Sequence, residues 1–502
     1  MQTAAKGKSA KEHSGGAAWA AIAGAVCALV FRYGFFGISS LSLIPSSSSF
    51  RAVLLALVCT LLIRALPMPF LRGRAKAYAW QVLTFVEWVC WTFLMTDPFL
   101  SVYIYLAISI DLPEQFSLYD ASFIAISTSA LATALFALWS ARQRRGLPYL
   151  VSFYTSSFLV LLMIFYALII PKHKSFGVDV GLLCSSDRVK NVEPILSYPC
   201  HRGDRWCKVL FESGNLYNAV YHRPTNRFIA SGGNSRILLF VNADTKRTED
   251  VMVFGGSVRY LTYDPFRDRL LVDVRSRRCL VEVDPYSASE TNCYFRDIAF
   301  DSMFQLGCFD RSGDVLTFTV DTEYRLYRRV YGSGKEDIYD IFPLSCAYGL
   351  VCLDGNRVVV SSMCPSPLLR SGIWVMRMQP GFEVVRKKRL IFPALDMEYD
   401  PTHDLIYLAR AILNRVDIYR ASDMSKAGTL KVPSGTRELA LDGTGRFLYA
   451  GSMTSGRIVK IDLETGRIVE RYRIGPMLRQ LSYEKDLDSV IATSACGVFR
   501  LK

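Results

Sequence analysis

The sequence lacks the short motifs that mark many enzymes and metal sites. It has no CxxC pair, so a zinc site of that type is not expected. No GxSxG, HExxH or Walker loop occurs, and the five histidines are scattered along the chain. No run of Lys and Arg alternates with aromatic residues, so the net charge of +14 does not indicate a nucleic-acid partner. These absences leave the chain without a recognisable catalytic motif.

Long uncharged stretches occur between residues 17 and 171. A transmembrane helix must cross ~30 Å of hydrocarbon, and five stretches are long enough to do so. A cleaved signal peptide explains the first stretch less well, because it is too long and further spans follow. The segment 98–112 is short and fits a re-entrant or interfacial segment better. We therefore predict five transmembrane helices at residues 17–43, 50–66, 78–95, 119–140 and 149–171, after a basic disordered tail at residues 1–16.

The distribution of basic residues predicts how this region is oriented. Clusters of Lys and Arg lie at residues 6–11, 72–76 and 142–145. Five crossings place all three clusters on one side, which the positive-inside rule identifies as the cytoplasm. The N-terminus is then cytoplasmic and the C-terminal domain extracytoplasmic, in the periplasm if the protein is bacterial. The lipid bilayer is the first expected partner.

Two ionisable residues, Arg32 and Glu87, fall inside predicted spans. Charges within a membrane are costly and are often functional. One alternative is a structural Arg32–Glu87 pair, or a protonated Glu87. The other is a proton or ion path, although the spans show no inverted repeat of the kind seen in transporters.

The C-terminal part of the chain is organised by a repeat. Residues 436–476 contain four short alternating segments divided by turns, the first of which is Asp442-Gly443-Thr444-Gly445. Four such strands make one blade of a β-propeller. A strand end followed by an acidic residue or its stand-in recurs at intervals of about 40–46 residues, which is typical of propellers. The copies lie at Tyr221, Tyr263, Phe309, Leu353, Tyr399, Leu441 and Tyr483, so we predict an all-β, seven-bladed β-propeller at residues 205–502.

The phrase LDGTGRFLYAG…GRIVKIDLETGRIV resembles the repeat of YVTN-type and NHL-like propellers. The resemblance covers about residues 205–502 and is strongest at residues 395–476. The membrane region carries no resemblance of this kind.

The last repeat supplies only three strands before the chain ends at Lys502. We predict that residues 206–211 form a fourth strand beside them, because closing the ring removes exposed sheet edges. Residues 172–204 are then a connector between the membrane region and the propeller.

Ten of the 13 cysteines follow residue 180, a pattern that permits disulfides if this domain lies outside the cytosol. Cys346 and Cys364 flank one predicted hairpin turn, and Cys279 and Cys293 flank another. Cross-strand neighbours lie within reach of disulfide geometry. The alternative is that these cysteines are free and buried.

The innermost strands of a propeller line its channel, so we sought ligand contacts near their first residues. One pattern is a basic collar for a carboxylate or phosphate. Its members and their neighbours are Arg259, Arg437, Arg479, Gln305, Tyr217 and Tyr260.

A second pattern at the same level consists of Asn218, Asp396 and Glu438, which could offer oxygen ligands to Ca²⁺. It resembles the metal site of lactonase-type propeller enzymes, although the blade number differs and the ligand set is incomplete. A rim of Arg and acidic residues paired with one another would account for both patterns.

Because a fold does not fix a function, three hypotheses follow. The first is a membrane-anchored extracytoplasmic module that binds or scaffolds a protein or envelope ligand. The alternative is a calcium-dependent hydrolase or lactonase acting in the channel. The third is a transport or signalling unit that uses Arg32 and Glu87.

Overall fold

A computed structural model describes Cys184 and residues 189–501 of the protein, apart from short gaps of which 296–303 and 365–371 are the longest. The predicted tail, the five spans, the segment 98–112 and the charges Arg32 and Glu87 lie outside the described residues. Among the residues that are described, no helix has both the length and the apolar character needed to cross a membrane.

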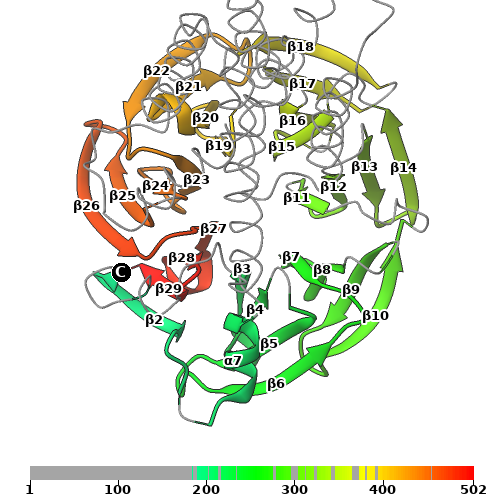
Figure 1. Cartoon of the computed structure of the whole chain (residues 1–502). Helices are drawn as coiled ribbons and strands as arrows, with labels where there is room; N and C mark the ends of the chain where they lie inside the picture. The colour runs from blue at the N-terminus through cyan, green and yellow to red at the C-terminus, as the bar shows by residue number, and fades with distance from the viewer. Residues whose placement is uncertain are drawn as a thin grey trace, which may run out of the picture. The chain divides into compact units, whose positions relative to one another are not determined.

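The described chain forms a seven-bladed β-propeller, as the repeat predicts (Figure 1). Each blade is a four-stranded antiparallel sheet whose first strand faces the centre of the ring and whose fourth strand forms the rim. Blade 6 carries one additional strand, β1 (Val189–Lys190), on the outer side of its fourth strand. The sequence repeat therefore corresponds to one blade.

Blade 1 contains β3 (Leu216–His222), β4 (Arg227–Gly232), β5 (Ile237–Asn242) and β6 (Thr248–Val253), and blade 2 contains β7 (Val258–Asp264), β8 (Arg269–Val274), β9 (Leu280–Asp284) and β10 (Ser289–Tyr294). Blade 3 contains β11 (Phe304–Phe309), β12 (Val315–Val320), β13 (Arg325–Val330) and β14 (Lys335–Asp340), and blade 4 contains β15 (Ser345–Cys352), β16 (Arg357–Cys364), β17 (Gly372–Arg377) and β18 (Glu383–Arg389). Blade 5 contains β19 (Met397–Asp400), β20 (Leu405–Arg410), β21 (Arg415–Arg420) and β22 (Lys426–Lys431), and blade 6 contains β23 (Thr436–Leu441), β24 (Phe447–Ser452), β25 (Arg457–Asp462) and β26 (Arg467–Ile474). Blade 7 contains β27 (Gln480–Glu484), β28 (Ser489–Ser494), β29 (Gly497–Leu501) and β2 (Val192–Ser197).

Burial changes from the middle of each blade to its rim. The third strand of blade 1, β5, is buried at every position except Asn242, because neighbouring blades cover both of its faces. The fourth strand of blade 4, β18, is exposed at every position. The core is therefore a series of apolar layers between blades, and the rim carries the charges.

The ring closes through β2 and not through residues 206–211. Strand β2 pairs antiparallel with β29, so that Val192 lies opposite Leu501 and Ser197 opposite Gly497. As predicted, a strand from before the first repeat completes the last blade. That strand lies earlier in the chain than the predicted one. The propeller therefore includes residues 189–197 of the predicted connector.

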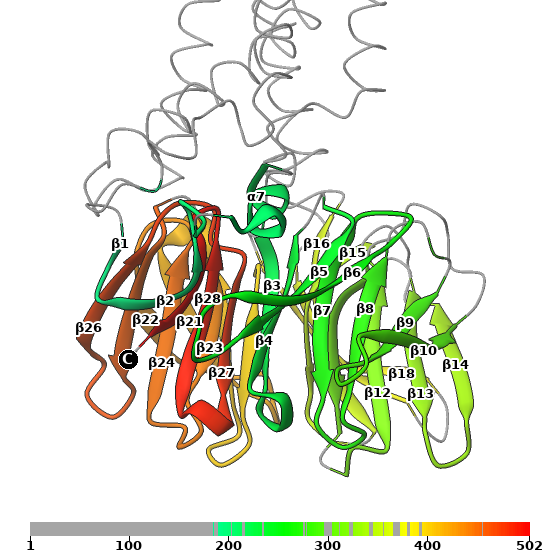
Figure 2. The same ribbon diagram turned by 90° about the horizontal axis from the view of Figure 1, so that it is seen from below.

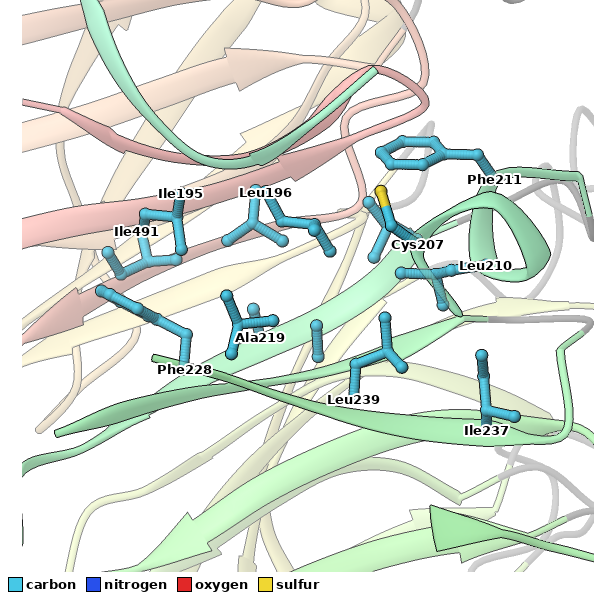
Figure 3. Close-up of a cluster of buried hydrophobic side chains, with 14 of the residues drawn as sticks. Ile195, Leu196, Cys207, Leu210, Phe211, Ala219, Phe228, Ile237, Leu239 and Ile491 are labelled. Carbon is cyan, nitrogen blue, oxygen red and sulfur yellow. The ribbon is translucent and has the colours of Figure 1, made fainter. Parts of the chain in front are cut away.

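The prediction of a strand at residues 206–211 is wrong, because these residues form helix α7 (Arg205–Glu212). Asp204 begins the helix by accepting a hydrogen bond from the backbone N–H of Cys207 at 2.9 Å, which is an N-cap interaction. The buried residues Cys207, Leu210 and Phe211 recur every three or four positions, which is helical and not strand spacing. Figure 3 shows these side chains packed against Leu196 and the first strands of blade 1.

The propeller has two faces that differ in their connections (Figure 2). We call the face that carries α7, where the innermost strands begin, the α7 face. The opposite face, called here the hairpin face, carries the turns between the first and second strands. Short 3₁₀ helices form two of these turns, at Arg223–Thr225 and Lys485–Leu487, and a third 3₁₀ helix, Ala411–Leu413, joins the second and third strands of blade 5.

The acidic residue of the repeat shapes the turns of the hairpin face. Asp400 accepts a hydrogen bond from the backbone N–H of Thr402 at 2.8 Å. Asp442 accepts one from the backbone N–H of Phe447 at 2.8 Å. A carboxylate that holds the backbone ahead of it in this way stabilises a tight turn, which explains why the acidic residue follows the strand end in most copies.

Candidate functional site

The mouth of the channel on the α7 face is shaped by β-bulges in the innermost strands. The register of β3 shifts between Leu216 and Asn218, which leaves Tyr217 as the additional residue. The register of β23 shifts between Thr436 and Glu438, which leaves Arg437 in the same role. A bulge bends its strand and redirects a side chain, and bulges are common beside functional sites. Tyr217 and Arg437 each lie four residues before the strand end of their repeat, which is the position from which the collar is predicted.

Three of the predicted collar residues come from neighbouring blades and lie close together. The guanidinium of Arg479 lies 4.9 Å from the centre of the Tyr217 ring, within the range of a cation–π interaction. The Nε of Arg437 lies 3.0 Å from Oε1 of Glu438, and its Nη1 lies 3.4 Å from Sδ of Met453. Blades 1, 6 and 7 thus contribute an aromatic ring and two cations to one side of the mouth. We call Tyr217, Arg437 and Arg479 the collar.

Two other predicted collar members cannot be placed in the same way. Arg259 lies in β7 and Gln305 in β11, but their side chains lie outside the described part of the structure. Their membership of the collar stays a prediction.

Three carboxyl groups, called here the channel carboxyls, are buried or half-buried beside the collar: Asp396, Glu398 and Glu438. Burial raises the pKa of Glu398 to about 8, and the nearby Glu438 carboxylate adds to the effect. Burial also raises the pKa of Glu438 to about 7, although Arg437 and Arg479 act in the opposite direction. The pKa of Asp396 lies well above its usual range because of burial and then of its two acidic neighbours. Near neutral pH these groups therefore hold protons that exposed carboxyls would release.

Tyr260 belongs to the same electrostatic environment although it comes from blade 2. Burial raises its pKa to about 12, and the charges of Asp396 and Glu438 contribute to this rise. Tyrosine and carboxyl groups from opposite sides of the ring therefore influence one another across the channel.

Some predicted ligand contacts have a structural role, because their side chains join consecutive blades. Oδ2 of Asp396 accepts a hydrogen bond from the backbone N–H of Leu439 in the next blade at 2.7 Å. The hydroxyl oxygen of Tyr260 accepts one from the backbone N–H of Gly307 at 3.3 Å. Gln480, at the same repeat position, accepts one from the backbone N–H of Ala219 at 2.6 Å through Oε1. We call these three contacts the inter-blade staples.

The staples bear on the predicted calcium site. Within the described residues, no group of three or more His, Cys, Asp or Glu side chains is placed to hold a metal ion. Asp396 already accepts the Leu439 hydrogen bond, and Glu438 already contacts Arg437. Calcium binding by Asn218, Asp396 and Glu438 stays a prediction, without a supporting observation among the described residues.

The cysteines form more bonds than hairpin spacing predicts. Cys279 and Cys293, which flank a hairpin turn, form a disulfide. The register of β15 and β16 places Cys364 opposite Ser345, one position away from Cys346. A slip of one residue moves a side chain to the other face of a sheet, so Cys346 and Cys364 are not a directly opposed pair.

Three further disulfides join positions that sequence reasoning does not pair: Cys184–Cys496, Cys200–Cys207 and Cys308–Cys352. The sequence does indicate the Cys308–Cys352 disulfide, because each cysteine immediately precedes the strand-end residue of its repeat and the two repeats are consecutive. Equivalent positions on neighbouring innermost strands face each other, and their Cα atoms are 5.7 Å apart. Repeat position therefore predicts inter-blade contacts as well as blades.

A second polar cluster lies on the hairpin face, where His222 replaces the usual acidic residue of the turn. His222 is fully buried, and its Nε2 lies 2.7 Å from Oδ1 of Asp268 in the next blade. The hydroxyls of Tyr263 and Tyr286 donate to the same carboxylate, at 2.8 and 2.7 Å. These hydrogen bonds join blades 1 and 2 through the cluster.

The comparisons with known proteins identify no family. No protein-family model matches the chain, and a search of curated proteins found no significant match. The structure establishes a seven-bladed propeller, which is consistent with a propeller repeat superfamily. A propeller is a fold suited to a binding or scaffold module.

Proposed function

We propose that this protein is a membrane-anchored binding module whose propeller lies on the extracytoplasmic side and holds an anionic group of a protein or envelope ligand at the collar. The observation that carries the proposal is the convergence of Arg437, Arg479 and Tyr217: Arg479 lies over the Tyr217 ring, and the charges of both Arg437 and Arg479 act on Glu438. Guanidinium groups suit carboxylate and phosphate oxygens, because they present several N–H donors in one plane.

Protonation of Glu438, one of the channel carboxyls, would free Arg437 of the collar to bind a ligand. Glu438 contacts Arg437 at 3.0 Å, so an arriving anion must compete with it. Because burial raises the pKa of Glu438 to about 7, this group takes up a proton near neutral pH at little cost. An anionic ligand that replaces Glu438 beside Arg437 therefore binds together with a proton, and its affinity increases as the pH falls.

The disulfides support an extracytoplasmic propeller. Four of them occur among the described residues, and such bonds form and persist mainly in oxidising compartments. The basic loops of the predicted membrane region point to the same orientation. A test is alkylation of intact cells followed by reduction and mass analysis. Cys184, Cys207 and Cys308 should be protected until reduction; free thiols at all three would contradict this orientation.

The binding proposal is tested by purification of the full chain from its native membranes after chemical crosslinking. We expect a stable partner that is lost at least about tenfold in Arg437→Ala and Arg479→Ala, the loss that a charge-assisted contact supplies. Arg223→Ala is the matched control, because Arg223 is an exposed cation on the hairpin face. Equal recovery of the partner with all three variants would contradict a role for the collar.

A further inference from the structure

Strand β18 has an outer edge that no other strand covers in the part of the chain that the structure describes. It is the last strand of its sheet, and all seven of its residues are exposed. Val384 and Val385 are 47% and 37% exposed, so apolar side chains accompany the open backbone. Unpaired N–H and C=O groups along such an edge can pair with another strand.

The charges of β18 differ from those of the outer strands β6 and β14. Glu249 in β6 pairs with Arg227 at 2.8 Å, and Glu336 in β14 pairs with Arg329 of the adjacent strand. In β18, Glu383 pairs with Arg377 at 2.7 Å, but the four cations that end the strand form no ion pair with any described residue. They are Arg386, Lys387, Lys388 and Arg389. The rim of blade 4 therefore carries a run of positive charge that its own sheet does not neutralise.

The protein itself shows that an outer edge of this propeller accepts an additional strand. In blade 6, β1 pairs antiparallel with the outer strand β26, so that Val189 lies opposite Ile474 and Lys190 opposite Arg473. Figure 1 shows the equivalent outer position of β18 on blade 4. The twist and spacing of a blade rim are thus compatible with a fifth strand.

We propose that the open edge of β18 binds an acidic, extended segment of another protein, which joins blade 4 as a fifth antiparallel strand. Main-chain hydrogen bonds supply affinity in this mode of recognition, and side chains supply specificity. The four cations select an acidic segment and repel a second copy of β18, which also prevents edge-to-edge aggregation. This surface lies on the rim and does not involve the collar, so the two proposals can be tested independently.

The test uses the full chain in detergent and a fluorescent peptide of alternating valine and glutamate. A second peptide has the same length and the same number of glutamates but has prolines in place of its central valines, which prevents strand pairing. We expect the first peptide to bind and the proline peptide to bind at least about tenfold more weakly, because the main-chain bonds are lost. Added salt should weaken binding of the first peptide. Equal binding of the two peptides would overturn the proposal.

The variant Lys387→Glu/Lys388→Glu reverses two of the cations. We expect it to weaken binding of the first peptide at least about tenfold. The matched control, Arg247→Glu/Lys485→Glu, makes the same change in net charge at two exposed positions in blades 1 and 7. Equal loss in both variants, or no loss in either, would overturn the proposal.

Vesicles containing phosphatidylserine provide the remaining comparison. Binding of the vesicles through the four cations, without binding of the acidic peptide, would show that the run of charge recognises a lipid surface and would overturn the proposal. Peptide binding without vesicle binding supports it.

Discussion

The channel carboxyls and two carboxyl groups in turns between third and fourth strands, Asp462 and Asp423, have opposite preferences for a proton. Burial raises the pKa of Glu398 to about 8 and that of Glu438 to about 7. In the turn between β25 and β26, the backbone N–H of Thr465 donates to Asp462 and lowers its pKa, and Arg446 contributes to the same effect. Hydrogen bonds from Ser425 likewise lower the pKa of Asp423.

The difference depends on donors and not on residue type. A turn supplies N–H groups that point at the carboxylate and stabilise its charged form, whereas the innermost strands supply few donors and remove water. Asp396 shows both influences, because it accepts a backbone hydrogen bond and still has a raised pKa. In this propeller, burial near other acids has the larger effect.

The most disruptive test of this comparison is Asp396→Ala. The substitution leaves the backbone N–H of Leu439 without its acceptor between two blades, and an unsatisfied buried donor costs about 1–3 kcal/mol of unfolding free energy. Asp396→Asn is the control, because its Oδ1 keeps the acceptor while removing the charge that Glu438 and Glu398 oppose. We expect a clear loss of thermal stability in the alanine variant and little or none in the asparagine variant. Equal losses in both would show that the charge, and not the staple, is what matters.

A smaller effect is expected from Glu398→Gln on the pH dependence of stability. The pKa of Glu398 rises from 4.5 to about 8 on folding, so the folded state binds a proton more tightly than the unfolded state. Its contribution to stability is complete below pH 4.5 and is lost as the pH rises through about 8. Thermal unfolding measured across this window should show a decline that is shallower in the glutamine variant. Parallel curves for the two proteins would refute the assignment.

The turn carboxyls should show the opposite sign. Because the pKa of Asp462 is lowered on folding, its contribution to stability is present above pH 3.8 and is lost as the pH falls through the folded value. Asp462→Asn should therefore reduce the acid sensitivity of unfolding below pH 3.8 and leave the behaviour near pH 8 unchanged. A change near pH 8 alone would mean that the turn and the channel are not independent.

The smallest effect is expected from Asp423→Ala, which removes an exposed turn carboxylate. Its partner Ser425 can bond to water instead, so the thermal unfolding midpoint should not change measurably. This variant sets the baseline against which the other three are read. A loss as large as that of Asp396→Ala would remove the distinction between channel and turn.

The repeat made the propeller predictable, because each blade carries the same turn chemistry and the same alternation of apolar residues. Counting positions from the strand end also brought together Tyr217, Arg437 and Arg479, since equivalent residues of neighbouring blades lie at the same height in the channel. Repeat position does not predict which group each side chain contacts. Asp396 looks like a ligand in the sequence, because nothing local reveals that the next blade presents an N–H to it.

The closing strand was missed for a related reason. Residues 206–211 resemble the fourth strands of other repeats, such as residues 251–254 and 468–474, and this favours a strand. The N-cap Asp204 and the spacing of Cys207, Leu210 and Phe211 specify a helix instead. Strand β2 contains Pro194, so its own pattern is weak, and its pairing with β29 depends on contacts about 300 residues away. Pairing between strands so far apart in the sequence depends on the whole propeller having formed, which local sequence patterns do not reveal.

The pairing of β2 with β29 has a consequence for how the protein is made. At a synthesis rate of about 5–20 residues per second, β2 leaves the ribosome about 15–60 s before its partner does. Throughout that interval the growing chain carries a strand whose partner has not yet been made. A ribosome that stops before β29 therefore yields a molecule with six complete blades and a seventh in which β2 has no partner.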